Sequence, residues 1–259
     1  MRKGLIITLA LGLLVAVSSV ALAAEKPITV QAGNLRLTFN GGGKPKALSK
    51  TKLEPIALNV SGKIAEVDGS KPPPLTEVVV DTDRNGMVDA KGVPTCKQGQ
   101  LEARTTAAAR QVCSKAVIGT GTTDVDLEEP ESRPVVLHSQ LTAFNGGEKG
   151  GVTTIYIHAF LTTPVTAALV TTVKISKEHD GLYGTRSVAT IPKIAGYAGS
   201  VTAFDLTFQK KLFSYKGQKH GYLLAKCPTG KFYAQAEAKF HDGTQIGPAQ
   251  IVRACTPKG

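Results

Sequence analysis

The sequence predicts a mainly β protein, an antiparallel β-sandwich with one short helix, and a closed barrel is the alternative architecture. Three observations support this fold class. The chain is rich in Val, Thr and Ile, with 27 Gly, 14 Pro and no Trp, which favours strands and turns over helices. Polar and apolar residues alternate with period two in many short segments. Gly-containing turn signals separate several of these segments, at the spacing of sandwiches and barrels.

The amino-terminal part of the predicted sheet has three strands. Residues 34–39 alternate between polar and apolar side chains, residues 56–67 have β character, and residues 76–80 form an apolar run. The Gly/Lys-rich residues 40–52 predict a loop. Residues 68–74 end in three consecutive prolines, which favour an extended conformation without internal hydrogen bonds. We interpret this segment as a connection within one domain rather than as a linker between two.

One helix is predicted, over residues 100–113. Ala and Gln dominate this segment, and both are compatible with a helix interior. At helical spacing Leu101, Ala108 and Val112 share one face. This face is the one we expect to be buried.

From residue 134 onward the chain predicts strand after strand. Turn signals lie at Asn145-Gly-Gly, Asp180-Gly, Lys216-Gly and Asp242-Gly, where Gly and Asn/Asp supply the backbone freedom that a tight turn needs. The predicted strands are residues 135–144, 152–160, 165–175, 186–191, 201–208, 211–215, 222–226, 232–240 and 245–252.

The first 23 residues predict a cleaved signal peptide. Arg2 and Lys3 precede an uncharged apolar stretch that ends in Ala21-Leu-Ala23, a pattern typical of signal peptidase substrates. The stretch approaches the length of a membrane-spanning helix, but the Ala-x-Ala ending favours cleavage. No later segment is long and apolar enough to span a bilayer. We therefore expect residues 24–259 to form a single β-rich domain, secreted or on the exterior of the cell envelope, and not transmembrane after cleavage.

The four cysteines predict disulfide bonds. Cys96, Cys113, Cys227 and Cys255 are an even number in a chain that we expect to be exported, and three pairings are possible. We predict the sequential one, Cys96–Cys113 and Cys227–Cys255, because each pair flanks a compact segment. A zinc site is the alternative, but no two cysteines have the spacing of zinc ligands.

Several short motifs between residues 75 and 255 carry a resemblance to a known family. They are Asp83-Arg-Asn-Gly86, Lys91-Gly-Val-Pro-Thr-Cys96, Gln100-Leu, Thr105-Thr-Ala, Cys113, Phe144-Asn-Gly, Cys227-Pro and Arg253-x-Cys255. With these residues the chain resembles a family of secreted actinobacterial hypothetical proteins of unknown function. The resemblance includes all four cysteines, implies no activity and leaves out the residues before 75.

The segment Asp81-Thr-Asp-Arg-Asn-Gly86 is a candidate calcium loop. Asp81, Asp83 and Asn85 place oxygen ligands at positions 1, 3 and 5, and Asp89 falls at position 9. Position 12 is Gly92, so the bidentate Glu of an EF-hand is missing, and the flanking residues predict strands instead of helices. The alternative that we favour is a hairpin turn in which Asn85 and Gly86 adopt positive φ angles.

Catalytic motifs are weak. His138 and His158 would face each other if the hairpin of residues 135–160 were symmetric about Glu148, and two imidazoles so placed could bind a metal. A third ligand is not identifiable, and a slip of one residue would separate them. The segment Ser49-Lys-Thr-Lys52 matches the bare Ser-x-x-Lys pattern without its partner motifs, so we interpret it as a solvated loop. No catalytic residue is predicted.

Basic and aromatic residues interleave near the carboxyl-terminal end. The chain has a formal charge of +11, and no acid lies between Asp205 and Glu237. Lys210, Lys211, Lys216 and Lys219 are candidate anion-binding residues, with anionic cell-envelope polymers or lipid headgroups as partners. Nucleic acid is not expected, because an exported protein seldom meets it. The alternative is that these lysines only keep strand faces solvated.

Together these observations predict a secreted, non-enzymatic binding or envelope-associated β-domain that contacts an anionic surface, with no cofactor. The alternative is a metal-assisted hydrolase or a calcium-binding module. The sequence leaves the ligand and the oligomeric state open.

Overall fold

The computed structural model describes residues 26–128, 135–162, 166–179 and 181–259. The predicted signal peptide lies outside these residues, as do Glu129 and Glu131 of an acidic stretch near residue 130. The mainly β fold with one α-helix is confirmed. Both disulfides are present as predicted, with Cα–Cα distances of 5.6 Å for Cys96–Cys113 and 6.2 Å for Cys227–Cys255.

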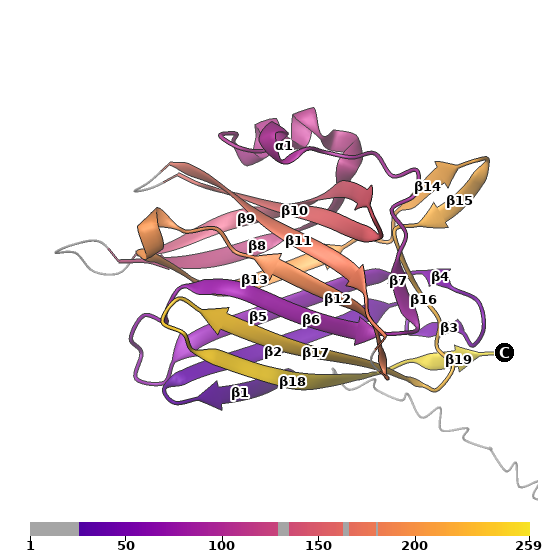
Figure 1. Cartoon of the computed structure of the whole chain (residues 1–259), viewed down its shortest axis with the longest axis horizontal. Coiled ribbons are helices and arrows are strands. Elements are labelled where there is room, and N and C mark those ends of the chain that lie inside the picture. The colour runs from indigo at the N-terminus through magenta and orange to yellow at the C-terminus, as the bar shows by residue number, and fades with distance from the viewer. Residues whose placement is uncertain (1–25, 129–134, 163–165, 180) are drawn as a thin grey trace, which may run out of the picture.

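Twelve strands of the described residues form one antiparallel sheet that curls on itself (Figure 1). In spatial order they are β1 (Ile28–Ala32), β2 (Leu35–Lys44), β5 (Ala57–Glu66), β13 (Gly199–Phe208), β8 (Val117–Leu127), β9 (Val135–Lys149), β10 (Val152–Leu161), β11 (Ala167–Lys177), β12 (Tyr183–Thr190), β6 (Leu75–Asp83), β17 (Lys231–Phe240) and β18 (Gln245–Ala254). The sheet includes β1, β2 and β5, which precede residue 75 in the chain, together with strands that follow it.

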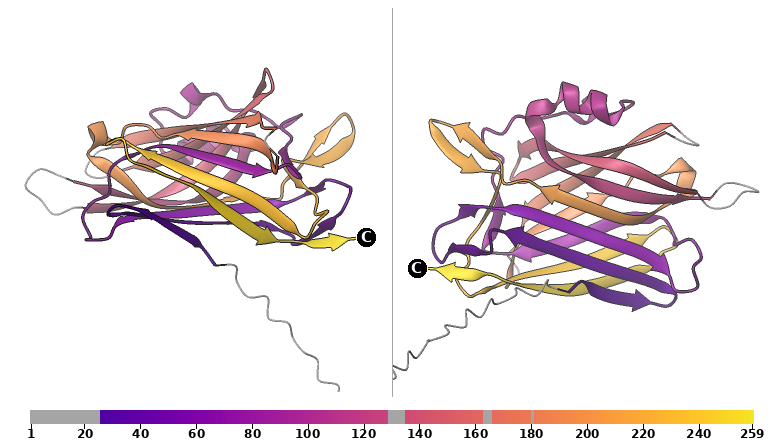
Figure 2. Two further views of the ribbon diagram at one scale, coloured as in Figure 1. Left: turned by 60° about the horizontal axis from the view of Figure 1, so that its bottom comes forward. Right: turned by 180° about the vertical axis from the view of Figure 1, so that it is seen from behind.

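The curled sheet is nearly closed into a barrel. Its two edge strands, β1 and β18, lie side by side in both views of Figure 2, without a hydrogen-bonded ladder between them. Their apolar residues pack into one core cluster that includes Leu37, Leu75, Phe240 and Ile246. A second cluster around Leu141, Ile155 and Leu206 lies under β8, β9, β10, β11 and β13.

Three small sheets and four short helices complete the part of the fold that the structure describes. The small sheets are β4 (Glu54–Pro55) with β16 (Leu223–Ala225) and β7 (Gly86–Val88), the hairpin of β14 (Leu212–Tyr215) and β15 (Gln218–Gly221), and the parallel pair β3 (Ala47–Ser49) and β19 (Thr256–Lys258). The helices are α1 (Thr106–Val112) and the 3₁₀ turns η1 (Gln98–Gln100), η2 (Ser114–Ala116) and η3 (Ala195–Tyr197).

The predicted helix is shorter than residues 100–113. Ala103 has φ of 55°, which breaks the segment, and α1 begins only after Thr105, whose side chain accepts a hydrogen bond from the N–H of Ala108. The later start rotates the helix, so Ala109 and Cys113 are buried while Val112 is 45% exposed. Of the predicted face, Leu101 is fully buried and Ala108 partly buried, whereas the exposure of Val112 contradicts the prediction.

Two predicted loops belong partly to strands. In the segment 40–52, β2 continues through Gly41–Gly43 to Lys44, where those glycines pair with β5. β9 runs past the predicted turn at Asn145 to Lys149, and the chain turns instead at Gly150 and Gly151, both with positive φ. Asn145 is fully buried, and its side chain hydrogen-bonds the carbonyls of Val93 and Pro94.

Candidate functional site

The β14–β15 hairpin contains half of the predicted anion-binding lysines. Its two-residue turn is Lys216-Gly217, and both residues have positive φ, 48° and 76°. This is the backbone of the tight turn that suits the twist of a hairpin, so the predicted turn is confirmed. The hairpin projects from the body of the barrel beside β7 and β16 (Figure 1).

One face of the hairpin is fixed to the protein. Phe213 is buried in the core cluster of Leu141 and Leu206. Tyr215 packs on the backbone of Gly92, where an added Cβ would lie 2.7 Å from the Tyr215 ring. The Nδ1 atom of His220 lies 3.6 Å from the carboxylate of Asp89. The hairpin is therefore held at its base and along one side.

Several side chains of the hairpin are exposed to solvent, including part of Tyr215. Leu212 is 50% exposed and Tyr215 is 41% exposed, and Lys216 and Lys219 are exposed beside them. The ammonium of Lys216 lies 5.5 Å from the centre of the Tyr215 ring. The exposed residues next to the turn, Tyr215, Lys216 and Lys219, form what we call the hairpin tip. Leu212 pairs with Gly221 at the base of the hairpin, and its side chain lies on the face opposite Tyr215.

The other two predicted lysines lie at the foot of the hairpin, outside its tip. Lys210 is exposed and contributes to the lowered pKa of the Glu54 carboxyl, whose main cause is the hydrogen bond from the backbone N–H of Ser49. Lys211 donates to the backbone carbonyl of Val117 at 3.1 Å and lies over the Phe213 ring. Lys211 is therefore engaged with the protein itself.

The candidate calcium loop is a crossing between two sheets. β6 ends at Asp83 in the large sheet, and β7 begins at Gly86 in the small sheet with β16 and β4. The chain does turn at Arg84 and Asn85, but neither Asn85 nor Gly86 has a positive φ. The predicted hairpin geometry is therefore wrong, because β7 pairs with β16 instead of folding back on β6.

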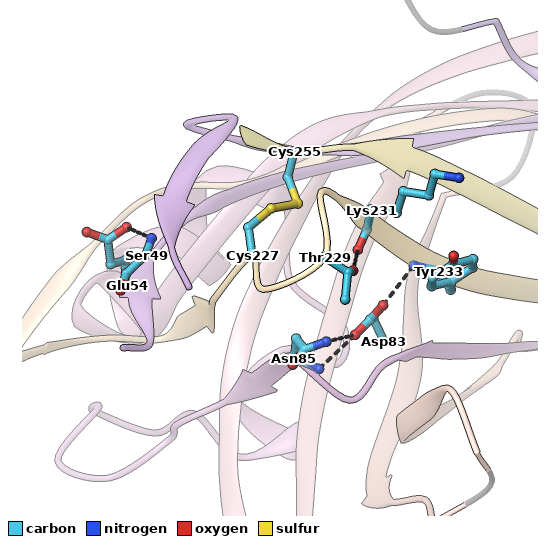
Figure 3. Close-up of a disulfide and its surroundings, with 9 residues drawn as sticks. All are labelled: Ser49, Glu54, Asp83, Asn85, Cys227, Thr229, Lys231, Tyr233 and Cys255. Atoms are coloured by element: carbon cyan, nitrogen blue, oxygen red, sulfur yellow. Dashed lines mark hydrogen bonds between the residues drawn. A yellow bond between two sulfur atoms is a disulfide. The ribbon is translucent and has the colours of Figure 1, made fainter. Parts of the chain in front are cut away.

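The carboxylates of this segment bind separate partners. Asp83 accepts hydrogen bonds from the backbone and side chain of Asn85 and from the N–H of Tyr233 (Figure 3). Asp81 accepts from Arg186 and Gln235. Asp89 accepts from the N–H of Lys91.

No group of three or more His, Cys, Asp or Glu side chains within the described ranges is placed to hold a metal ion. Asp81, Asp83 and Asp89 therefore do not converge on one point. Calcium binding by these residues and Asn85 stays a prediction that a metal titration tests.

The two histidines do not face each other. His158 lies opposite Thr142 in β9, because the β9–β10 hairpin turns two residues later than predicted. His138 lies opposite Asp124 in β8, and its Nδ1 is 2.7 Å from that carboxylate. His158 is fully buried, with Nε2 3.0 Å from the carbonyl of Arg104. The proposed two-histidine metal site is therefore wrong.

The Ser49–Lys52 segment contains a local turn. The Oγ of Ser49 accepts hydrogen bonds from the N–H groups of Thr51 and Lys52, a local side-chain-to-backbone pattern. Glu54 accepts from the N–H of Ser49 at 2.8 Å and lies 3.5 Å from Lys258 (Figure 3 shows Ser49 and Glu54).

The interior of the barrel holds a cavity that the sequence reasoning missed. Its volume is about 420 Å³. Its walls are side chains from both core clusters, among them Phe39, Val78, Leu141, Val173 and Phe204. Residues of β7 and β16 line one part of it, and Ile191 and Ile194 line another. The only sign of this cavity in the sequence is the large number of predicted strands. The sequence does not give the order of the strands in the sheet, and without that order a barrel around a cavity could not be predicted.

Comparison of the chain with protein-family models, with curated proteins and with solved structures finds no match. The resemblance to secreted actinobacterial proteins over residues 75–255 therefore stays a prediction. Across the residues described, the structure contains no helix long and apolar enough to cross a membrane.

Proposed function

We propose that this protein is a secreted, non-enzymatic binding protein that docks on anionic lipid surfaces through its hairpin tip. The observation that carries the proposal is the composition of this hairpin, where Tyr215, Lys216 and Lys219 are exposed at the tip and Leu212 is exposed nearer the base. Lysines attract anionic headgroups, and exposed Leu and Tyr side chains enter the interface between headgroups and acyl chains.

The position of the hairpin supports this function. It projects from the barrel, so that its tip can reach a flat surface before the strands do (Figure 1). Phe213 in the core and His220 beside Asp89 hold the hairpin near its base, and Tyr215 packs against Gly92. A hairpin ordered before contact loses little conformational entropy on docking, which favours affinity.

Apolar exposure favours a lipid surface over a soluble anionic polymer. A polymer is recognised by charge alone, and Leu212 at 50% exposure would contribute nothing to it. Insertion of Leu212 into a bilayer interface would instead remove apolar surface from water, at about 25 cal/mol per Å².

Vesicle binding tests the proposal. The processed protein is sedimented with vesicles of phosphatidylcholine alone or mixed with phosphatidylglycerol, at two salt concentrations. We expect binding only to the anionic vesicles, weakened by salt. Replacing Lys216 and Lys219 by Gln should cost about 2 kcal/mol, or roughly 30-fold in affinity, at about 1 kcal/mol per lysine.

A matched control and a second variant complete the design. Lys63→Gln with Lys174→Gln removes two exposed lysines from strands of the large sheet and should leave binding unchanged. Leu212→Ser should weaken vesicle binding and leave binding to polyglutamate unchanged. Equal loss from the tip and control variants would contradict the proposal. Binding to polyglutamate alone would reassign the partner to a polymer.

A further inference from the structure

We infer that the barrel interior is a binding site for one extended acyl chain. The proposed docking of the hairpin tip concerns the outer surface, and this inference does not depend on it. It rests on the width of the barrel, the chemistry of the cavity walls and the length of the cavity.

The barrel is too wide for its own side chains to fill. A barrel of about eight strands has an interior just wide enough for inward-facing side chains, and the diameter grows with the number of strands. Twelve strands in the described part of this chain therefore enclose surplus space. The two core clusters occupy part of it, and about 420 Å³ remains between them. This volume lies within the range of about 300–1,000 Å³ for ligand sites.

The incomplete burial of several inward-facing residues also indicates that the interior is hollow. Val60, Val78, Leu169 and Ile175 line the cavity, yet each is only partly buried. In a filled core such residues would contact other side chains on all sides. Here these side chains stay accessible to water from inside the barrel, so a large apolar surface is not covered by other side chains.

The walls select an apolar ligand. Val, Leu, Ile, Phe and Ala dominate them, with hydroxyl side chains such as Thr171 and Ser187. The lining also includes four other polar residues: Asn40, Lys46, Asp83 and Arg253. Water is a poor occupant, since it needs two to four polar partners and apolar cavities of about 150 Å³ stay dry. An apolar molecule covers the walls and gains contacts that the empty barrel lacks.

The length of the cavity favours a chain over a compact ring system. On β13 the lining residues run from Val201 to Phe208, which is about 23 Å at roughly 3.3 Å per residue. A volume of about 420 Å³ spread over that length is long and narrow. At one end the lining includes Leu223 and Leu224 of β16, the strand that follows the β14–β15 hairpin in the chain. The acyl chain would enter at this end, next to the base of the hairpin.

Two substitutions on β11 form the decisive pair. Thr171 lines the cavity, and its neighbour Thr172 points to the opposite face of the strand and does not. Thr171→Trp places an indole in the path of the acyl chain, whereas Thr172→Trp makes the same chemical change outside. The wild-type chain has no Trp, so the emission of each introduced indole also reports its surroundings.

The experiment measures binding of hexadecanoic acid and its methyl ester by displacement of a polarity-sensitive fluorophore. We expect wild type and Thr172→Trp to bind both probes one to one, and Thr171→Trp to bind about tenfold more weakly or worse. Its emission should be shifted to the blue relative to Thr172→Trp, and its melting temperature should not fall. If it fails to fold, Ala189→Leu, in the same cavity wall, takes its place.

Two results would overturn the inference. One is wild-type protein that binds neither hexadecanoic acid nor its ester. The other is equal binding by wild type and a folded Thr171→Trp variant with a blue-shifted indole, which would place the ligand elsewhere. Failure of vesicle docking would leave these measurements unaffected, because the two probes are dissolved as monomers and need no surface.

Discussion

Arg186 on β12 holds Asp81 on β6 with two parallel hydrogen bonds, from Nε to Oδ1 at 2.8 Å and from a terminal nitrogen to Oδ2 at 3.0 Å. Gln235 on β17 donates to Oδ2 at 2.8 Å. The three residues join neighbouring strands of the large sheet. The two partners differ in burial, since the side chain of Asp81 is 4% exposed and that of Arg186 is 45% exposed.

This difference predicts unequal costs for removing either partner. Arg186→Met leaves a buried carboxylate that still accepts a hydrogen bond from Gln235, and we expect this change to lower the free energy of unfolding by about 3 kcal/mol. Asp81→Asn leaves a guanidinium that water can reach, so it should cost about 1–2 kcal/mol. Urea unfolding of both variants measures the two values.

The double variant provides the control. Its cost should be smaller than the sum of the single costs, because the residues act on each other. A larger cost for Asp81→Asn than for Arg186→Met would contradict the role assigned to burial.

His158 predicts loss of stability in mild acid. Burial lowers the pKa of His158 below its ordinary value, although the carbonyls of Arg104 and Leu101 oppose the shift. The unfolded chain therefore takes up a proton as the pH falls below about 6.5, while the folded protein does not. Stability should fall by up to about 1.4 kcal/mol per pH unit below that value, until the folded state also binds the proton.

Thermal or urea unfolding between pH 8 and pH 5 checks this prediction. In His158→Gln the slope in this window should be smaller than in wild type. His138→Gln is the matched control, because His138 is exposed and paired with Asp124. An unchanged slope in His158→Gln would contradict the prediction.

Asp81 predicts a second range of acid pH in which the stability of the folded protein falls. The hydrogen bonds from Arg186 and Gln235 hold the pKa of the Asp81 carboxyl below its ordinary value. The stability from this network is present above the unfolded pKa of about 3.9 and is lost as the pH falls through the lower folded pKa. Asp81→Asn should remove this part of the acid sensitivity, which unfolding below pH 4 measures.

The two disulfides should stabilise the protein unequally. In the chain-entropy model, the 17-residue separation of Cys96 and Cys113 is worth about 3 kcal/mol and the 28-residue separation of Cys227 and Cys255 about 3.6 kcal/mol. Each pair replaced by Ser should lower the melting temperature, and the Cys227/Cys255 variant should lower it more. The reverse order would show that packing, not loop closure, dominates.

Local patterns predicted the strands well where polar and apolar residues alternate, as in β5 and β17. They failed at β8, because Gly119 and Gly121 weaken a strand signal. In the fold these glycines admit the backbone of β13, where the carbonyls of Thr207 and Asp205 occupy the space of a Cβ. The reason for the glycines is a neighbour distant in sequence, which no local pattern contains.

The same limit applies to the sites. The Lys216-Gly217 turn is local and was predicted. The positions of His138 and His158 depended on the register of a hairpin, and two glycines at 150 and 151 displaced its turn. The cavity depends on the order of all twelve strands of the described sheet. The histidine positions and the cavity were therefore missed because they depend on strand pairings that no local pattern contains.

The segment of Asp81 to Asp89 predicts no tight calcium binding. The oxygens of Asp81 and Asp83 already accept hydrogen bonds from Arg186, Gln235, Asn85 and Tyr233. A calcium ion needs six to eight oxygens around one point, so binding would require these networks to break.

We expect less than stoichiometric calcium in the purified protein and the same melting temperature in calcium and in chelator. A calcium-dependent rise would contradict this expectation, since calcium at 100 times its dissociation constant would stabilise the fold by about 2.7 kcal/mol. Such a rise would be assigned to this segment only if Asp83→Asn abolished it and Asp242→Asn, in an exposed turn, did not.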